Sequence, residues 1–365
     1  MTINELPSRI INYEGREYLF FSGTSYLGLA QNRQMQALLT EGVARYGLHF
    51  GASRNGNLQL AVYAEAESAL ARKAGAPAAL TVSSGMLAGQ LVVDWLVGQV
   101  GLAAVGFQAP GTHPALWHPL LKPQLVDLHH TILPWLPPQP TYILTDALNT
   151  IRSELYSFDW IAQLPDDQPI FLVVDDSHGL GVLNGGCGSW PGLAKKLAHK
   201  PNVRLIVTAS LAKAMGLPGG VIFSDPDTLA AIRKTAYFGA CSPMPPAYAH
   251  AYTRADALYE LAHEKLMQNI TLAEQLLPLG MFSHAPGYPV FYTDHDELYP
   301  HLLEKGIFVY SFAYPTPAHK ANTRIVISAF HEPEDIEKLA TAVRLFADNH
   351  SHVCAAGNTQ SGQNR

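Results

Sequence analysis

The segment "VRLIVTASLAKAMGLPGGVIFSD" (203–225) places one lysine between two apolar runs. The runs 203–210 and 219–225 have the length and composition of buried strands. Lys213, between them, has small and apolar neighbours and no acidic residue close by. A buried lysine without a partner is costly unless it loses its charge, and one way to lose it is to form a Schiff base with a carbonyl compound. The segment therefore predicts two strands joined by a loop with an unusual lysine.

The rest of the first 240 residues alternates between strand-like and helical patterns. The helical patterns cover 63–75, which Gly75 should close, and 85–99. Three further apolar runs are "AALTVSS" (78–84), "TYILTDAL" (141–148) and "IFLVVDDSHG" (170–179). Buried strands that alternate with helices predict an α/β fold whose mostly parallel sheet is covered on both faces.

After residue 240 the pattern changes. A long helical stretch to about Leu277 precedes two short strand-like runs, "YPVFYT" and "TRIVISAF", and a last helix over 332–349. This order predicts a smaller α+β domain. The expected organisation is an N-terminal segment (1–40), a large domain (41–238), a small C-terminal domain (239–350) and a disordered tail (351–365).

Composition is that of an ordinary globular protein, with 48% hydrophobic and 15% charged residues among 365. The net charge of −6 comes from mixed acidic and basic residues, so neither nucleic acid nor an anionic membrane is an expected partner. The first residues carry no secretory pattern, and no apolar run reaches membrane-spanning length. Cys187, Cys241 and Cys354 lie far apart, which favours reduced thiols in the cytoplasm.

Three of the predicted strands end in polar residues. In an open α/β sheet, ligands bind beyond the carboxyl ends of the strands, so these residues should face one crevice. Each motif has a plain structural alternative, a helix N-cap for Ser84 and a loop cap for the Asp-Asp pair. Asp175 and Asp176 should point in opposite directions, one of them toward a helix N-terminus. The residues concerned are Ser84-Gly85, Asp175 to His178, and Ser210 with Lys213.

Other kinds of site fit the sequence less well. "GLGVLNGG" (179–186) departs from the dinucleotide-binding glycine pattern at its last glycine. Asp176, Ser177 and His178 are consecutive and so cannot converge as a hydrolytic triad. The sixteen histidines are scattered, which argues against a metal site, and the adjacent His129 and His130 are expected at the surface.

The order of these motifs resembles the fold-type-I pyridoxal 5′-phosphate (PLP) enzymes and, within them, the α-oxoamine synthase family. The resemblance runs from "SYLGLA" (25–30) and "YGLHFGASR" (46–54) to "RIVISAFHEPEDI" (324–336). It implies the PLP-dependent transferase fold, which is aspartate aminotransferase-like, with a large domain and a smaller C-terminal one. It also implies a homodimer with the active site at the subunit interface.

The resemblance assigns roles to four residues around the cofactor. Lys213 looks like the lysine that holds PLP and later removes the proton from the substrate Cα. Asp175 resembles the partner of the pyridine nitrogen, which keeps that nitrogen protonated so that the ring can accept electrons. His178 would hydrogen-bond near the phenolic oxygen, and His113 would stack on the ring; the structural alternative for His113 is a loop histidine.

The phosphate and the substrate also have candidate ligands. The resemblance implies that the turn from Ser84 binds phosphate through the backbone of Gly85 and Met86. The hydroxyl of Ser210, where the family usually has threonine, would assist, with Ser242 contributed by the neighbouring subunit. Arg324 matches the arginine that binds the amino-acid carboxylate, and Thr24 stands where the family has a substrate-contacting asparagine.

Further departures lie at the expected substrate end. Tyr63 replaces a family histidine, and "TDALNTIRSELYSF" lacks the family's glutamate and Ser-Met-Asp-Gly, with Asp146 and Arg152-Ser153 in their place. These changes do not support activity as the biotin-pathway synthase. The favoured hypothesis is a PLP-dependent transferase that condenses a small amino acid with an acyl donor such as acyl-CoA. An aminotransferase on the same scaffold is the alternative, and a catalytically idle binding protein is a third.

Overall fold

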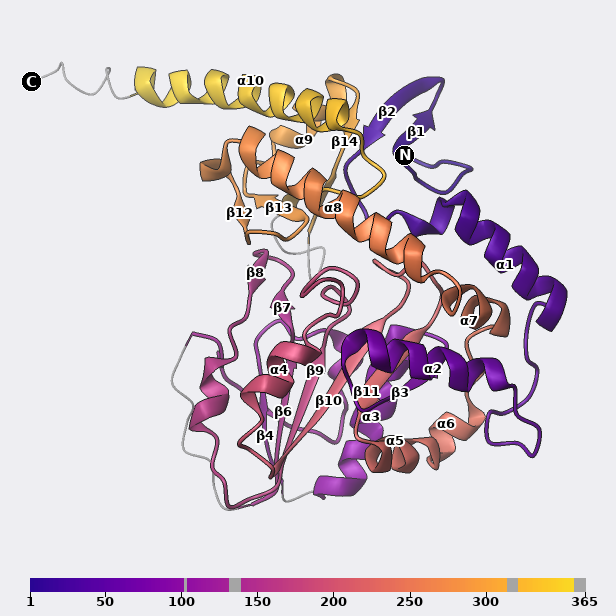
Figure 1. The fold of residues 1–365 in the computed structure, drawn as a ribbon. Coiled ribbons are helices and arrows are strands. Elements are labelled where there is room, and N and C mark those ends of the chain that lie inside the picture. Colours follow the sequence, from indigo (N-terminus) through magenta and orange to yellow (C-terminus); the bar gives the residue numbers. More distant parts are fainter. Residues whose placement is uncertain (102–103, 131–138, 314–320, 358–365) are drawn as a thin grey trace, which may run out of the picture. The chain divides into compact units, whose positions relative to one another are not determined.

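The computed structural model describes residues 1–101, 104–130, 139–313 and 321–357 (Figure 1). By its internal contacts the chain forms two compact units. Unit 1 consists of residues 1–31, 150–154 and 262–365, and unit 2 consists of residues 32–149 and 155–261. In the described residues, no helix combines the length and apolarity that crossing a membrane requires.

Unit 2 contains a seven-stranded sheet in the order β3-β11-β10-β9-β6-β4-β5. β11 pairs antiparallel with β3 and β10, whereas the remaining neighbours pair in parallel. The strands are β3 (Ala78–Val82), β4 (Val105–Gln108), β5 (Gln124–Leu125), β6 (Thr141–Asp146), β9 (Ile170–Asp175), β10 (Val203–Ser210) and β11 (Gly220–Ser224). The mostly parallel sheet predicted from the sequence is confirmed.

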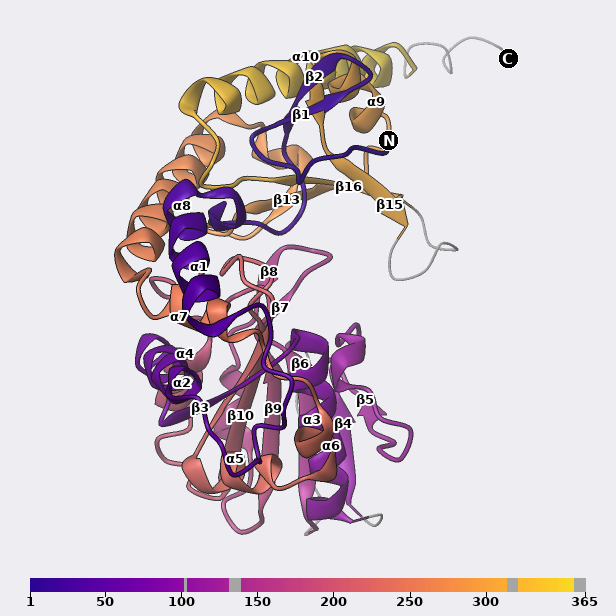
Figure 2. The ribbon, with the colours of Figure 1, turned by 90° about the vertical axis from the view of Figure 1, so that its right-hand side faces the viewer.

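Helices cover both faces of this sheet. α2 (Ala61–Ala74) and α4 (Trp190–Lys196) lie on one side and α3 (Gly85–Val100) on the other (Figure 2). Trp95 and Leu96 of α3 pack with Ile206 and Ile222 of the sheet in a continuous apolar core. Two-sided coverage explains why the strands read as apolar runs without alternation. The other helices here are α1 (Arg33–Tyr46), η2 (Pro114–Leu116), η3 (Asp159–Gln163), α5 (Pro226–Arg233), α6 (Ala236–Ala240) and α7 (Pro246–Tyr252).

The ends of several elements follow from local chemistry. Ser84 caps α3 by accepting a hydrogen bond from the N–H of Leu87 at 3.1 Å. Gly75 closes α2 in the left-handed conformation, at φ 69°, as its sequence position predicts. Asp225 ends the strand run and caps α5, whose first residue is Pro226.

Unit 1 is built on two small sheets. One has the order β12-β13-β16-β15 with antiparallel pairs, and the other the order β1-β2-β14. The strands are β1 (Ile10–Tyr13), β2 (Arg16–Phe20), β12 (Ser283–His284), β13 (Val290–Thr293), β14 (Ile307–Phe308), β15 (Tyr310–Ala313) and β16 (Ala321–Val326). The helices are η1 (Leu29–Gln31), η4 (Leu279–Met281), α9 (Leu298–Glu304) and α10 (Pro333–Gly357). α8 (Asp256–Leu276) and the short strands β7 (Leu148–Asn149) and β8 (Glu154–Leu155) complete the chain.

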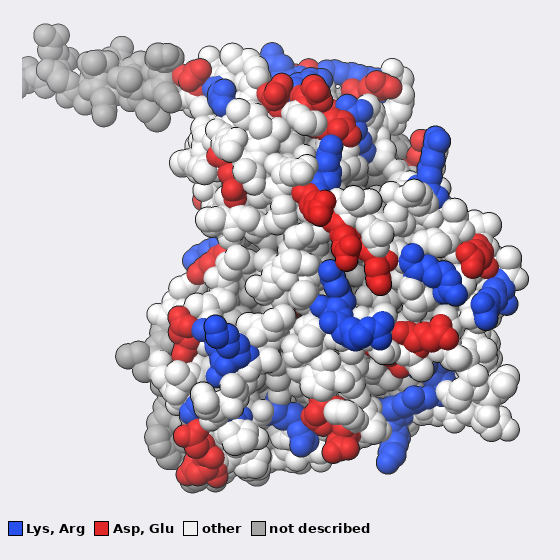
Figure 3. Space-filling view, viewed as in Figure 1, with Lys and Arg blue, Asp and Glu red and all other residues white. Residues whose placement is uncertain are grey.

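The bounds of the two units differ from the domain boundaries expected at residues 40 and 238. Residues 32–40 and 239–261 group with unit 2, where α1 and α7 pack so closely that a Cβ on Gly42 would lie 2.6 Å from the carbonyl oxygen of Ala247. The expected domain boundaries stay a prediction. α10 extends to Gly357, and residues 358–365 of the expected tail lie outside the described residues. Acidic and basic side chains are interspersed over the face drawn in Figure 3.

Candidate active site

The sequence candidates of unit 2 meet at the carboxyl ends of its strands. β6, β9 and β10 run in parallel and end at Asp146, Asp175 and Ser210. β3 leads at the same edge into Ser84, and the loop after β4 leads to His113. A crevice beyond such an edge is where open α/β sheets bind ligands. These residues therefore share one edge of the sheet, and the expectation that they face one crevice stays a prediction.

Asp175 and Asp176 have separate partners, as the alternation of side chains predicts. Oδ1 of Asp175 accepts a hydrogen bond from the N–H of Ser177 at 2.9 Å. Oδ2 of Asp176 accepts one from the N–H of Ser189, at the start of α4, at 2.6 Å. Burial raises the pKa of Asp176 to about 7. Asp176 therefore holds the loop before α4, and the role of Asp175 as the partner of the pyridine nitrogen stays a prediction.

Lys213 lies half-buried in the loop between β10 and β11. The loop is held by the N–H of Leu211, which donates to the carbonyl oxygen of Gly219 at 3.0 Å, and by the N–H of Leu217, which donates to that of Leu211 at 2.9 Å. The N–H of Gly216 donates to the carbonyl oxygen of Lys213 at 3.1 Å. Gly216 has φ 68°, which glycine adopts without strain. This closed loop fixes the backbone of the lysine at the strand-end edge.

His113 stands at the start of η2. Its Nδ1 accepts a hydrogen bond from the N–H of Ala115 at 3.1 Å, and its own N–H donates to Oδ1 of Asp146 at 3.2 Å. Burial lowers the pKa of His113; the charge of Asp175 acts against this, and the charge of Lys213 adds to it. These mutual effects place His113, Asp175 and Lys213 within electrostatic reach of one another.

Asp146 is a site residue that the sequence did not single out for a role. It is the register partner of Asp175 on the neighbouring strand. Burial raises the pKa of Asp146 well above its ordinary value, and the charge of Asp175 raises it further. The signal in the sequence was the carboxylate at the end of the run 141–148, which stood out only as a departure from the family.

The start of α3 is the turn for which the sequence predicts phosphate binding. The N–H groups of Gly85 and Met86 belong to the first helical turn and have no acceptor within the helix. A Cβ on Gly85 would lie 2.6 Å from Cβ of Ser210, so this position accepts only glycine without movement. The N–H of Ser210 donates to Oγ of Ser177 at 2.9 Å. The turn and Ser210 are therefore in contact, as a shared phosphate site requires.

His178 and Ser242 are less constrained by the fold. His178 lies half-buried in the turn that follows β9, three residues beyond Asp175. Ser242 is exposed shortly after α6. The position of Ser242 fits a residue that a second copy of the chain would use, and its role stays a prediction.

Arg324 and Thr24 lie in unit 1. Arg324, on β16, is only 8% exposed, and one terminal nitrogen donates to the carbonyl oxygen of Gly23, next to Thr24, at 3.0 Å. Its guanidinium lies 5.9 Å from the ring centroid of Tyr310. Burial alone would lower the pKa of Arg324, but Tyr292 and Tyr26 outweigh it and raise the pKa. In the described part of the chain, its Nε has no hydrogen-bond acceptor. Both candidates thus lie in unit 1, where Arg324 is hydrogen-bonded to the residue next to Thr24.

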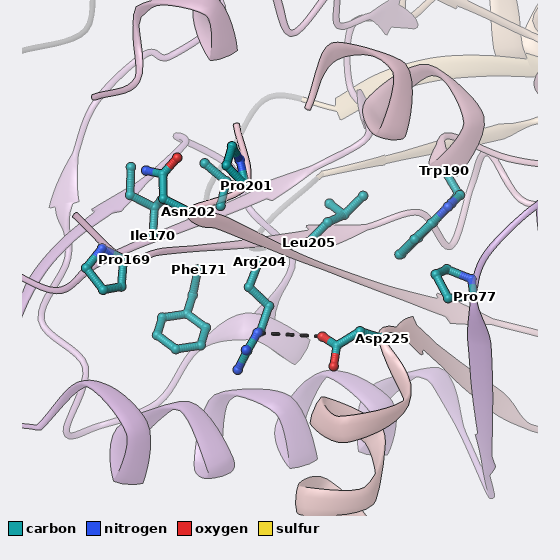
Figure 4. Close-up of a pocket in the computed structure, with 11 residues that line it drawn as sticks. Pro77, Pro169, Ile170, Phe171, Trp190, Pro201, Asn202, Arg204, Leu205 and Asp225 are labelled. Carbon is teal, nitrogen blue, oxygen red and sulfur yellow. Dashed lines mark ion pairs between the residues drawn. The ribbon is translucent and has the colours of Figure 1, made fainter. Parts of the chain in front are cut away.

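Two other features lie apart from this site. A cavity of about 440 Å³ opens where β9 and β10 begin, at the opposite edge of the sheet, and it contains Phe171, Arg204 and Asp225 (Figure 4). None of the candidate residues lines it.

His129 was expected at the surface and is half-buried instead, because its ring stacks on that of Tyr156 with a centroid distance of 3.5 Å. No metal-binding group of side chains is present among the described residues.

Comparison with known proteins identifies the family. Residues 157–343 match the model of the family described as aminotransferase class I and II. The chain belongs to this family. It is 29% identical to an 8-amino-7-oxononanoate synthase of Aliivibrio fischeri over 90% of this chain and 89% of the relative. It is 30% identical to an enzyme of the same name from Yersinia pestis over 89% and 88%.

Solved structures support the fold of this family member. Serine palmitoyltransferase from S. paucimobilis, solved with bound PLP and myriocin, superposes with a TM-score of 0.78. The match covers 94% of this chain and 91% of that one at 18% sequence identity, so it establishes the fold alone. The PLP-dependent fold and the resemblance to oxoamine synthases are confirmed, and the chain is a PLP-dependent transferase.

The residues present fit the cofactor that the family uses. Lys213, Asp175 and His113 lie at one sheet edge and influence one another electrostatically. Gly85 packs so closely on Ser210 that no side chain fits at this position, and its backbone N–H lies at the start of a helix, where anions bind. Lys213 would hold PLP, Asp175 its ring nitrogen, and the start of α3 its phosphate.

Proposed function

We propose that this chain joins a small amino acid to an acyl thioester, an acyl-CoA, with loss of CO₂. The proposal is supported by the 8-amino-7-oxononanoate synthases that align over nine tenths of the chain. It is supported equally by the residues at the strand-end edge of unit 2. A new bond forms between the amino-acid Cα and the acyl carbon, the thiol leaves, and the carboxylate departs as CO₂.

Bound PLP would act as the sink for negative charge that develops at the substrate Cα. Lys213 would remove the proton from that Cα and return one after CO₂ departs. Asp175 would keep the ring nitrogen protonated, His113 would cover the ring, and His178 would donate to the phenolic oxygen. Arg324 would bind the amino-acid carboxylate with its planar fork.

Two departures from the family lie at the expected substrate end. Thr24 replaces an asparagine, and Tyr63 replaces a histidine. The hydroxyl of Tyr63 donates to the carbonyl oxygen of Met244 at 2.8 Å, and the Arg54 guanidinium lies 4.5 Å from its ring centroid. Tyr63 is therefore part of a packed structural cluster, so the proposal stays with a class of substrates.

A second copy of the chain is the proposed partner. Met86 and Trp117 are 48% and 54% exposed, although both lie beside residues of the proposed cofactor site. Apolar side chains this exposed at a functional edge are typical of an interface. In a homodimer, Ser242 of the neighbouring copy would reach the phosphate. Among the described residues, Cys187 and Cys241 are free thiols, which supports the proposed cytoplasmic location.

The test supplies the PLP-loaded protein with a panel of small amino acids, with and without acyl-CoA thioesters. Release of the CoA thiol is measured with a thiol reagent, and the Lys213→Ala variant serves as the control. Thiol release that needs both substrates and Lys213 supports the proposal. Formation of a 2-oxo acid from the amino acid without a thioester would overturn it in favour of transamination. Absence of both reactions in the panel would also count against it.

A further inference from the structure

We propose that Asp146 is a positioning residue of this site: its carboxyl, beside Asp175 at the end of the neighbouring strand, fixes the main chain at His113. The inference rests on the proposed PLP site and deepens it. Nothing in the comparisons assigns a role to Asp146.

Asp146 and Asp175 end neighbouring parallel strands. They are register partners, so their side chains leave the sheet on the same face about 5 Å apart at Cα. The N–H of Ala147 donates to the carbonyl oxygen of Asp175 at 2.8 Å, which locks the two strand ends together. The fold thus brings two carboxyls close together, and only one of them is needed as the partner of a cationic ring nitrogen.

Two carboxylates at this separation disfavour each other's charge. Three groups face Asp146: Asp175 from β9, His113 from the loop after β4, and Lys213 from the loop after β10. Burial and the charge of Asp175 raise the pKa of Asp146, whereas the His113 N–H and the Lys213 charge lower it by less. Burial and the charge of Asp175 therefore shift Asp146 toward its neutral form.

The neutral form can still position His113. A protonated carboxyl keeps a carbonyl-type oxygen, which accepts the 3.2 Å hydrogen bond from the His113 N–H. Because His113 begins η2 and its Nδ1 caps the next turn, the orientation of its ring follows from its main chain. Oδ1 of Asp175 in turn accepts a hydrogen bond from the N–H of Ser177, a donor suited to a carboxylate.

The experiment compares the wild type with Asp146→Asn and Asp146→Ala. Asparagine keeps the acceptor oxygen and cannot ionise, whereas alanine removes the acceptor. PLP affinity is measured by absorbance titration, and Asp167→Asn, at an exposed loop position, is the control. We expect Asp146→Asn to bind within about threefold of the wild type at neutral pH, and Asp146→Ala to bind about tenfold or more weakly. Wild-type affinity for Asp146→Ala, or equal weakness of the two variants, would overturn the inference.

A second readout does not depend on PLP. The native state resists ionisation of Asp146, so rising pH should lower the unfolding free energy of the cofactor-free wild type relative to Asp146→Asn. A wild-type-to-variant difference that stays flat between about pH 5 and about pH 9 would contradict the neutral carboxyl. If the wild type binds no PLP but this difference is present, the proposed function fails. The part of the inference that concerns the protonation of Asp146 in the folded chain is then retained.

Discussion

A Cβ added to Gly220, at the start of β11, would lie 2.2 Å from the carbonyl oxygen of Ser84, the N-cap of α3. The antiparallel strand and the start of the helix are thus packed backbone against backbone. β11 is also the strand to which the Lys213 loop returns. The contact therefore links the proposed phosphate turn to the loop of the proposed catalytic lysine through main-chain atoms. Substitutions of side chains elsewhere should leave this contact unchanged.

Gly85→Ala tests this close packing. Its Cβ would meet Cβ and Cα of Ser210 at 2.6 and 2.7 Å, and the contact involves backbone that cannot swing away. We expect a loss of about 1–3 kcal/mol of unfolding free energy and weaker PLP binding. Gly98→Ala, in the same helix with nothing near its Cβ, is the matched control and should gain about 0.5–1 kcal/mol. Thermal unfolding and PLP titration measure both; equal behaviour of the two variants would refute the packing argument.

Lys213→Ala should abolish the visible absorption band that PLP gives on binding the wild type. Turnover should fall by about 10²–10⁴-fold or more, because the group that moves the Cα proton is lost. Lys195→Ala, on the exposed side of α4, should leave both unchanged. A visible band that survives washing of the Lys213 variant, together with cofactor that stays covalently attached after borohydride reduction, would mean that another residue holds the cofactor.

Arg324→Lys tests the carboxylate site in unit 1. Lysine keeps the charge and loses the fork, so the amino-acid KM should rise by about 10–100-fold while PLP affinity is unchanged. Arg344→Lys is the control, because Arg344 is exposed and contacts the carbonyl oxygen of Leu276. Steady-state kinetics at saturating acyl-CoA give the two values. An unchanged KM in the Arg324 variant would remove this residue from substrate binding.

Asp176 should make the unfolding free energy depend on pH. Its pKa is about 7 in the folded chain, against an ordinary value of 3.8, mainly because it is buried. Between these values the native state binds more protons than the unfolded state, so stability falls as pH rises from about 4 to about 7 and then levels off. The slope from this group is at most about 1.4 kcal/mol per pH unit. Asp176→Asn should remove that slope in denaturant titrations, and an unaltered slope would show that Asp176 titrates normally.

Leu120→Glu tests the interface proposed beside the site. Leu120 is 57% exposed and follows Trp117 in the loop after η2. A charge there should dissociate a homodimer and weaken PLP binding, because burying an unpaired carboxylate in an interface is costly. Leu261→Glu, with 62% exposure at another place in unit 2, is the control. Sedimentation velocity gives the mass, and an unchanged dimer in the Leu120 variant would place the interface elsewhere.

Much of unit 2 could be predicted from local sequence. The apolar run 203–210 coincides with β10, and the helical pattern 85–99 with α3, because burial on both faces of a parallel sheet leaves a continuous apolar signal. Asp175 and Lys213 stood out because a charge beside an apolar run is unusual. Asp146 ends the same kind of run but received no role, since its importance arises only from its pairing with Asp175 across two strands.

The burial of His129 also could not be predicted from local sequence. A pair of adjacent histidines in a polar stretch favours the surface, and His130 is indeed exposed. His129 is drawn inward by Tyr156, Phe158 and Trp160, which are distant in sequence and surround its ring. Burial lowers its pKa to about 4.

The sequence by itself determined most strands of the sheet in unit 2, the helices α2 and α3, and the family to which the strand-end residues point. These properties depend on the periodicity and chemistry of residues that are close in sequence, so they can be recognised in a short segment of the chain. The tertiary structure alone decided the order of the strands, and with it which aspartate of the Asp-Asp pair caps the loop before α4 and which one is the register partner of Asp146. Those choices depend on register and burial between distant segments, and no local pattern encodes them.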